Sequence, residues 1–313
     1  MKYVLKKTGV LIITLIMISL LAFLAFQIIP GDPTTKILGT DYSVERAEAL
    51  REELGLNGSI VSRYFKWLLG FIKGDPGISY SYFLPVSQVL DGKLGVTFAL
   101  SVISWIIVTL ISIPLGIAMA RYEKGPLDKF NVVFNQVFMA IPPFFLGILF
   151  VYIFGLLLKW FMPGRFISFD ESFMGAIFSL VLPALAISIP KAAKVAKLLR
   201  ASILNEMKND YVRTAYSRGN SRWEVIKSHV LRNALLPVIT YIAMTLSDIV
   251  AGSIIVEQVF ALPGLGRLLI SSIGNRDFPV AQYIVVIIAF VVVFMNYLAD
   301  IITQYVDPRV RLS

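Results

Sequence analysis

The feature that most constrains this chain is a set of long apolar runs separated by shorter polar segments. A helix of about twenty apolar residues crosses a hydrocarbon core of about 30 Å. Backbone polar groups find no water in lipid, so each run is predicted to be a helix. The alternating pattern that a membrane barrel requires is not evident. We therefore predict an all-α polytopic membrane protein with six transmembrane helices, at about residues 9–29, 95–120, 132–159, 173–190, 235–256 and 280–306.

The charge distribution predicts how these helices are oriented. Lysines precede the first run, which is longer than a secretion-signal core and is followed by no small-residue cleavage pattern, so we expect an uncleaved anchor. Cytoplasmic segments carry an excess of basic residues. Both termini are therefore predicted to be cytoplasmic, and the net charge of +9 is interpreted as a topology signal rather than a nucleic-acid-binding surface. Most of the 29 lysines and arginines fall in segments 1–8, 121–130, 191–232 and 307–313.

The extracytoplasmic segment 31–93 is too long for a bare connection between helices. Ser43 is placed to cap a helix through ERAEALREEL, which is expected to end at Gly55. The stretch VSRYFKWLLGFI repeats apolar residues at helical spacing. We predict short amphipathic helices that form a small ordered cap. The alternative is a helix that lies on the membrane surface and only packs.

Several kinds of chemistry are excluded by what the chain lacks. It has no cysteine, and His229 is its single histidine, so neither thiolate chemistry nor a multi-histidine metal site is available. The phosphate-binding pattern G-x-x-x-x-G-K-[ST] is absent, so no nucleotide cradle is expected. The sequence predicts no catalytic residue, no metal site and no cofactor bound by this chain.

A polar, basic stretch, residues 205–233, interrupts the apolar pattern, and we call it the polar segment. The fourth run continues past Pro190 as KAAKVAKLLRASILNEM, which is rich in good helix formers. Asn209 or Asp210 can then cap a second, short helix. The pattern predicts a helix that leaves the membrane as a stalk and is followed by a separate helical element.

The second half of the polar segment carries stop and start signals. Gly219 can close the short helix in the left-handed conformation. Ser221 and Glu224 match a capping box for a third helix, expected to run to about Asn233 and meet Pro237 where the fifth span begins. Rigid, capped helices suit a protein-docking surface, whereas the alternative is a positively charged loop with no partner. Interface-type residues occur throughout: Tyr211, Tyr216, Trp223, Arg213, Arg218 and Arg222.

The polar segment resembles the EAA-type coupling motif of ABC importer permeases, within the dipeptide, oligopeptide and nickel family. Further motifs of this family follow in order along the whole chain. At the Glu-Ala-Ala positions stand Arg213, Thr214 and Ala215, and Gly219 is retained. Tyr216 and Ser217 depart from the basic and small residues that the peptide branch usually carries. The motifs are IIPGDP (28–33), ELGLN (53–57), KGDPGISY (73–80), LLRASIL (198–204), YVRTAYSRG (211–219), HVLRNALLPVI (229–239), IIVEQVFALPGLGRLL (254–269), NRDFPVAQ (275–282) and DPRVR (307–311).

The resemblance implies a type I ABC importer permease without ATPase chemistry of its own, with residues 94–306 as the core. It implies a second, similar permease subunit, two cytosolic ATPases that use ATP-Mg, an extracytoplasmic binding protein and the lipid bilayer of a bacterial or archaeal cell membrane. Nucleic acid is not expected as a partner. The resemblance assigns contact with the ATPases to Tyr211, Arg213, Thr214, Ala215, Arg218, Gly219 and Arg222.

Few ionisable residues lie within the predicted spans. Asp248 lies inside the fifth span and Glu257 at its outer end, and charges at such depth usually face a cavity or a partner. We consider both as candidates for the translocation path or a gate, the alternative for Asp248 being a contact between helices. Asp300, in the sixth span, is expected to be structural.

The resemblance leaves the substrate open between short peptides, which we place first, and nickel or a metal chelate. A secondary transporter is a weaker alternative, because intramembrane carboxylates for ion coupling and an internal repeat are not prominent. Membrane enzymes and channels are disfavoured, because neither a catalytic cluster nor a filter sequence is present.

Overall fold

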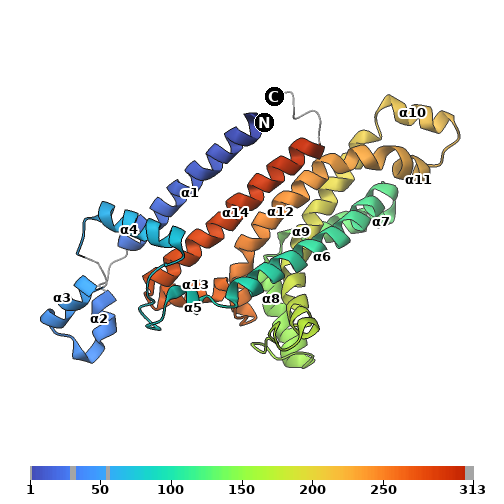
Figure 1. Cartoon of the computed structure of the whole chain (residues 1–313). Coiled ribbons are helices and arrows are strands. Elements are labelled where there is room, and N and C mark those ends of the chain that lie inside the picture. The colour runs from blue at the N-terminus through green and yellow to red at the C-terminus, as the bar shows by residue number, and fades with distance from the viewer. Residues whose placement is uncertain (1, 29–32, 54–56, 307–313) are drawn as a thin grey trace. The chain divides into compact units, whose positions relative to one another are not determined.

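The computed structural model of the chain (Figure 1) describes residues 2–28, 33–53 and 57–306. The regular secondary structure of these residues is helical, and the only strand-like pairing among them is an isolated bridge between Ile78 and Pro85. The chain divides into two compact units: Met1–Val96 with Pro263–Val293, and Thr97–Leu262 with Phe294–Ser313. Three sequence motifs, at 28–33, 53–57 and 307–311, lie partly or wholly outside the described residues, as do the predicted helix stop at Gly55 and the C-terminal tail.

The first unit consists of one long helix, several short helices and the beginning of α14. Helix α1 packs against α4, where the hydroxyls of Ser19 and Tyr64 are 2.9 Å apart and the rings of Phe23 and Tyr64 are 5.5 Å apart. Phe71 of α4 contacts Tyr283 of α14, with ring centroids 4.9 Å apart. The elements are α1 (Lys2–Ile28), α2 (Pro33–Leu38), a 3-10 turn (Gly39–Asp41), α3 (Val44–Glu53), α4 (Ile60–Lys73), α5 (Val86–Val89), α13 (Leu265–Gly274) and the first part of α14 (Phe278–Val306).

The two helices predicted for segment 31–93 are confirmed as α3 and α4. The Ser43 hydroxyl accepts from the Arg46 amide at 3.2 Å, as expected of a residue that caps α3. Helix α4 begins after Ser59, whose hydroxyl accepts from Ser62, and ends at Gly74 in the left-handed conformation (φ 79°). Local sequence signals therefore determine both ends of α4.

A buried carboxylate organises the loop before α5. Asp277 is fully buried and accepts hydrogen bonds from the Ser79 hydroxyl, the Tyr80 amide at 3.0 Å and the Ser81 amide at 3.3 Å. These bonds give a buried charge the partners that it requires. Residues 79–81 are therefore fixed to the turn that precedes α14.

The second unit contains α6 (Lys93–Arg121), except for its first turn, and the helices from α7 to α12. Helix α9 (Phe173–Glu206) packs against α6, α7 and α12 through small and polar residues. The Ser188 hydroxyl donates to the Ser104 carbonyl of α6 at 2.9 Å, and the Asn135 amide of α7 donates to the Ala193 carbonyl at 2.8 Å. A Cβ at Gly116 of α6 would lie 2.9 Å from the Ala196 carbonyl oxygen. Helix α9 is therefore tightly enclosed by its neighbours.

The predicted spans are confirmed as helices with one exception. Five helices among the described residues are long and apolar enough to cross a membrane. The third predicted span, 132–159, is not one helix: α7 (Pro126–Ala140) and α8 (Pro143–Phe150), with a π-helical turn (Val151–Leu157), are bent by 94°. Pro142 and Pro143 explain the break, because two successive residues lack an N–H and Pro disfavours a helical residue before it.

Candidate functional site

The polar segment begins as a continuation of α9 and then turns into a separate short helix. Helix α9 runs unbroken through Pro190 to Glu206, which confirms that the fourth apolar helix continues into the polar segment. Helix α10 (Asp210–Ser217) follows Asn209, whose backbone is extended although its side chain makes no capping bond. Asp210 lies in the first turn, where a negative charge interacts favourably with the helix dipole. In Figure 1, α10 and α11 lie beyond the ends of α9 and α12.

Helix α10 has one face turned toward its own chain and one turned away from it. Val212 and Ala215 are buried, with exposed fractions of 1% and 5%. Tyr211, Arg213, Thr214 and Arg218 are exposed. The structure therefore divides the predicted contact residues, because Ala215 supports the helix from beneath while the others form its outer surface.

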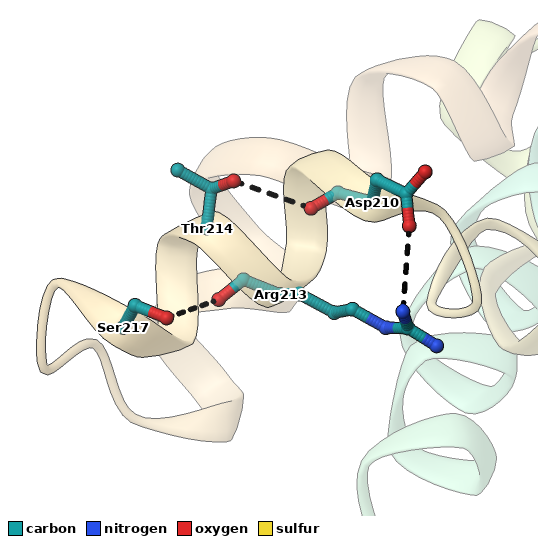
Figure 2. A network of polar contacts seen from close by, with 4 residues as sticks. All are labelled: Asp210, Arg213, Thr214 and Ser217. Atoms are coloured by element: carbon teal, nitrogen blue, oxygen red, sulfur yellow. Dashed lines mark hydrogen bonds and ion pairs between the residues drawn. The ribbon is translucent and has the colours of Figure 1, made fainter.

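Figure 2 shows polar contacts of Arg213, Thr214 and Ser217 that lie within α10. The Arg213 guanidinium lies 3.6 Å from the Asp210 carboxylate, and their side chains are 83% and 97% exposed. The Thr214 and Ser217 hydroxyls donate to backbone carbonyls of their own helix, at 3.3 and 3.1 Å. Such an exposed ion pair adds little stability. The outer face is thus a charged surface that a partner protein can engage at little cost to the fold.

Tyr211 connects α10 to the end of α9. Its hydroxyl donates to the Glu206 carboxylate at 2.8 Å, and the Asn209 side-chain amide donates to the same oxygen at 2.8 Å. Partial desolvation, together with the nearby Glu206 charge, raises the pKa of the Tyr211 hydroxyl.

Gly219 forms the corner after α10 in the left-handed conformation that the sequence predicts, with φ of 84°. Its amide donates to the Tyr216 carbonyl at 2.9 Å, and the Asn220 side chain donates to the Ala215 carbonyl at 3.0 Å. A Cβ at position 219 would meet no atom within 4 Å. The requirement for glycine is therefore set by backbone conformation and not by space.

The capping box at Ser221 and Glu224 is confirmed. The Ser221 amide donates to the Glu224 carboxylate at 2.7 Å, and the Glu224 amide donates to the Ser221 hydroxyl at 3.4 Å. The expected stop near Asn233 is wrong. Helix α11 (Arg222–Val225), a π-helical turn (Ile226–Val230) and α12 (Leu231–Val259) form one continuous helix that passes through Pro237.

Arg222 differs from the other predicted contact residues because its guanidinium contacts its own chain. One nitrogen donates to the Ala120 carbonyl at 3.2 Å and to the Glu123 carboxylate at 2.8 Å. The Arg121 guanidinium lies 4.6 Å from the centre of the Trp223 ring. Sequence reasoning did not identify Glu123 or Arg121, because both lie about a hundred residues before their partners and match no local pattern.

The two intramembrane candidates have different environments within the second unit. Asp248 is exposed on α12. Glu257 is completely buried, and its carboxylate accepts from the Thr97 hydroxyl at 2.8 Å and from the Ser253 hydroxyl at 3.4 Å. Lys194 of α9 lies 5.6 Å from the ring centre of Tyr241 of α12, which places basic residues of α9 beside α12.

The fold and its apolar helices define a multi-pass α-helical membrane protein. Residues 112–312 match the family of binding-protein-dependent transport system inner membrane components, and residues 1–81 match the N-terminal domain model of such membrane components. The chain belongs to this family, the permeases of ABC importers, and is a protein of the bacterial cell membrane that works with ATPase and binding-protein subunits.

Curated relatives match over nearly the full length. The chain is 35% identical to a putative peptide transport system permease of Brucella abortus over 98% of each chain. It is 34% identical to the oligopeptide transport system permease AppB of Bacillus subtilis over 99% of each. It is 31% identical to the nickel import system permease NikB of Staphylococcus aureus, over 100% of this chain and 92% of the relative.

Solved structures show a related fold. A chain of the inward-facing MetNI methionine ABC transporter matches 70% of this chain and 97% of its own length, with a TM-score of 0.56 and 16% identity. A chain of an amino acid ABC transporter matches with a TM-score of 0.52 and 18% identity, over 71% of this chain and 94% of its own. The predicted type I importer fold is thereby confirmed.

Proposed function

We propose that this chain is a permease subunit that forms the translocation pathway for short peptides, delivered by an extracytoplasmic binding protein and driven by partner ATPases. The observation that carries the substrate class is the match to peptide and oligopeptide permeases at 34–35% identity over almost the whole chain. The chain contributes no ATPase site, and the absence of a phosphate-binding glycine loop supports this.

The outer face of α10 is the ATPase-docking surface in this proposal. Its arginine and tyrosines are residue types common at protein interfaces. Among the residues that the structure describes, Arg213 pairs with Asp210 of its own helix and both side chains are exposed, so it can exchange Asp210 for a carboxylate of a partner. Movement of the docked ATPases would then pass into α9 and α12, the two membrane helices that flank the polar segment. We place both chain termini on the same, cytoplasmic side.

Asp248 lines the translocation path in this proposal. The bond from Ser202 to the Ala234 carbonyl and the proximity of Lys194 to Tyr241 define the antiparallel register of α9 and α12. In that register Asp248 lies about one helical turn from Lys191. An exposed charge inside a span is costly in lipid, so it is expected to face a cavity or a partner.

Glu257 remains a candidate gate residue. In this conformation its carboxylate is enclosed by Thr97 and Ser253, so a gating movement would have to break those bonds.

Uptake by the reconstituted complex tests the proposed function. The chain would be purified with its second permease subunit and its ATPases, inserted into lipid vesicles and supplied with the binding protein. We expect ATP-dependent accumulation of labelled di- to pentapeptides, and no accumulation of free or chelated nickel. Nickel uptake without peptide uptake would assign the chain to metal import. Absence of ATP-dependent uptake of either substrate would overturn the proposal.

Asp248→Asn and Asp300→Asn provide a matched pair for the path, because each replaces one aspartate of a span. We expect Asp248→Asn to reduce peptide uptake and Asp300→Asn to leave it near wild type. Equal uptake by the two variants would remove Asp248 from the path.

A further inference from the structure

The polar segment is joined to α6 by side chains, although no short stretch of chain connects them. Arg222 bonds to the Ala120 carbonyl at 3.2 Å and to the Glu123 carboxylate at 2.8 Å. The last carbonyls of a helix have no partner within the helix, so Arg222 caps the C-terminal end of α6. We call Arg121, Glu123, Arg222 and Trp223 the α6 junction.

A second contact strengthens the α6 junction, and here the arginine belongs to α6 and its partner to the polar segment. The Arg121 guanidinium lies 4.6 Å from the ring centre of Trp223 and 5.3 Å from that of Tyr122. A guanidinium over an aromatic ring is attracted by the ring's quadrupole. An arginine from each side therefore engages a residue of the other side. The two contacts use residues 222 and 223 of the polar segment and residues 123 and 121 at the end of α6.

Arg213 and Arg222 of the polar segment have different environments. The Arg213 side chain is 83% exposed and pairs with Asp210 of its own helix, whereas the Arg222 side chain is 41% exposed and pairs with a Glu123 side chain that is 25% exposed. Arg213 is available to a docked protein. Arg222 is occupied by the chain itself.

The chain path explains why such a junction matters. The polar segment is continuous with α9 and α12, so any displacement of it reaches these helices through the backbone. Helix α6 has no such connection. It does pack closely on α9 at Gly116, where a Cβ would lie 2.9 Å from both the Ala196 carbonyl oxygen and the Leu199 Cβ. A helix in such close contact must move together with α9 or resist its movement.

We infer that the α6 junction is a transmission element, in which Arg222 and Glu123 act as positioning residues that carry movement of the ATPase-docked polar segment into α6. The inference rests on the proposed function. It assigns Arg222 a role different from that of Arg213: loss of the Arg222–Glu123 pair leaves the ATPases bound but lowers the transport achieved per ATP hydrolysed.

Charge reversal and charge exchange test this inference in the reconstituted complex. The variants are Glu123→Arg, Arg222→Glu, the double exchange Glu123→Arg with Arg222→Glu, the milder Glu123→Gln, and Arg213→Glu for comparison. Three quantities are measured: retention of the ATPases during purification, ATP hydrolysis, and peptide uptake per ATP. The chain has no cysteine, so a Glu123→Cys and Arg222→Cys pair can also report, with a short thiol-to-thiol cross-linking reagent, whether the two sites lie close together in the membrane.

We expect each single reversal at the junction to retain the ATPases and to lower uptake per ATP by roughly two- to fivefold, the effect of a partly exposed ion pair. The double exchange should recover most of the loss, and Glu123→Gln should fall between wild type and Glu123→Arg. Arg213→Glu should instead weaken ATPase retention. Rescue by exchange shows that the two residues act as a pair. Lower uptake per ATP with the ATPases retained is the outcome that a merely structural role of the pair would not give.

Three results would overturn the inference: unchanged uptake per ATP in both single variants, failure of the double exchange to rescue, or loss of the ATPases in Arg222→Glu, which would make Arg222 a docking residue. Failure of the proposed function appears separately, as absence of ATP-driven uptake by the wild-type complex.

Discussion

Replacement of Gly219 tests whether the polar segment must keep its corner. The residue has φ of 84°, and an added Cβ would meet no atom within 4 Å, so the cost is one of backbone conformation alone. A left-handed alanine costs about 1–2 kcal/mol, and a β-branched residue costs more. A penalty of this size lowers the equilibrium constant for forming the left-handed turn at position 219 by about 5- to 30-fold. Asparagine tolerates this conformation better.

We therefore expect substrate-stimulated ATP hydrolysis by reconstituted complexes to fall in the order Gly219→Asn, Gly219→Ala, Gly219→Val, with the valine variant close to inactive. Gly74→Ala is the matched control. Gly74 ends α4 at φ of 79° and also has nothing within 4 Å of a Cβ, so it bears equal strain outside the polar segment. Wild-type hydrolysis in Gly219→Val, or an equal loss in Gly74→Ala, would refute the reasoning.

Three further predictions concern stability. Ser221→Ala removes the capping box and should cost about 1 kcal/mol, seen as roughly fivefold faster amide hydrogen exchange in α11; unchanged exchange would contradict it. Asp277→Ala leaves buried donors without an acceptor, so the free energy of unfolding should fall by at least about 1–3 kcal/mol. An unchanged midpoint of thermal unfolding would count against the buried contact. Burial raises the pKa of Tyr80 to about 12. In the unfolded chain the Tyr80 hydroxyl loses its proton near pH 10, so the free energy of unfolding should fall as pH rises from about 10 to 12. The fall should be smaller in Tyr80→Phe, and equal declines in the two proteins would contradict this.

Local signals allowed much of the polar segment to be predicted. The capping box at Ser221 and Glu224 and the left-handed Gly219 depend on residues within a few positions of one another, so the sequence contains all of the interacting parts. The same holds for Ser43. Interactions of this range require no knowledge of the fold.

Contacts between distant residues could not be predicted in this way. Glu123 and Arg222 are 99 positions apart, and Ser79 and Asp277 are 198 apart, so only the packed helices bring them together. In the sequence alone, nothing distinguishes Arg222 from the other arginines of the polar segment. Only the position of α6 distinguishes it from Arg213.

Proline effects were predicted only in part for a related reason. Pro190 and Pro237 lie inside continuous helices, whereas the pair Pro142–Pro143 divides the third span. A single proline removes one hydrogen bond and can be accommodated when neighbouring helices and local adjustments satisfy the freed groups. Two successive prolines remove two backbone hydrogen bonds and force the preceding residue to be extended. The bend therefore depends on the two prolines together and not on either one alone.

Site-directed cross-linking of the assembled complex tests most directly whether the exposed face of α10 holds the ATPases. Because the chain has no cysteine, Arg213→Cys or Ser217→Cys creates a unique thiol on that face, and Lys73→Cys creates one at the exposed end of α4. With a short thiol-to-amine reagent, we expect both α10 variants to join to an ATPase subunit and Lys73→Cys not to. If the intact complex gives no ATPase product from either α10 position, or gives one from position 73, α10 is not the docking element.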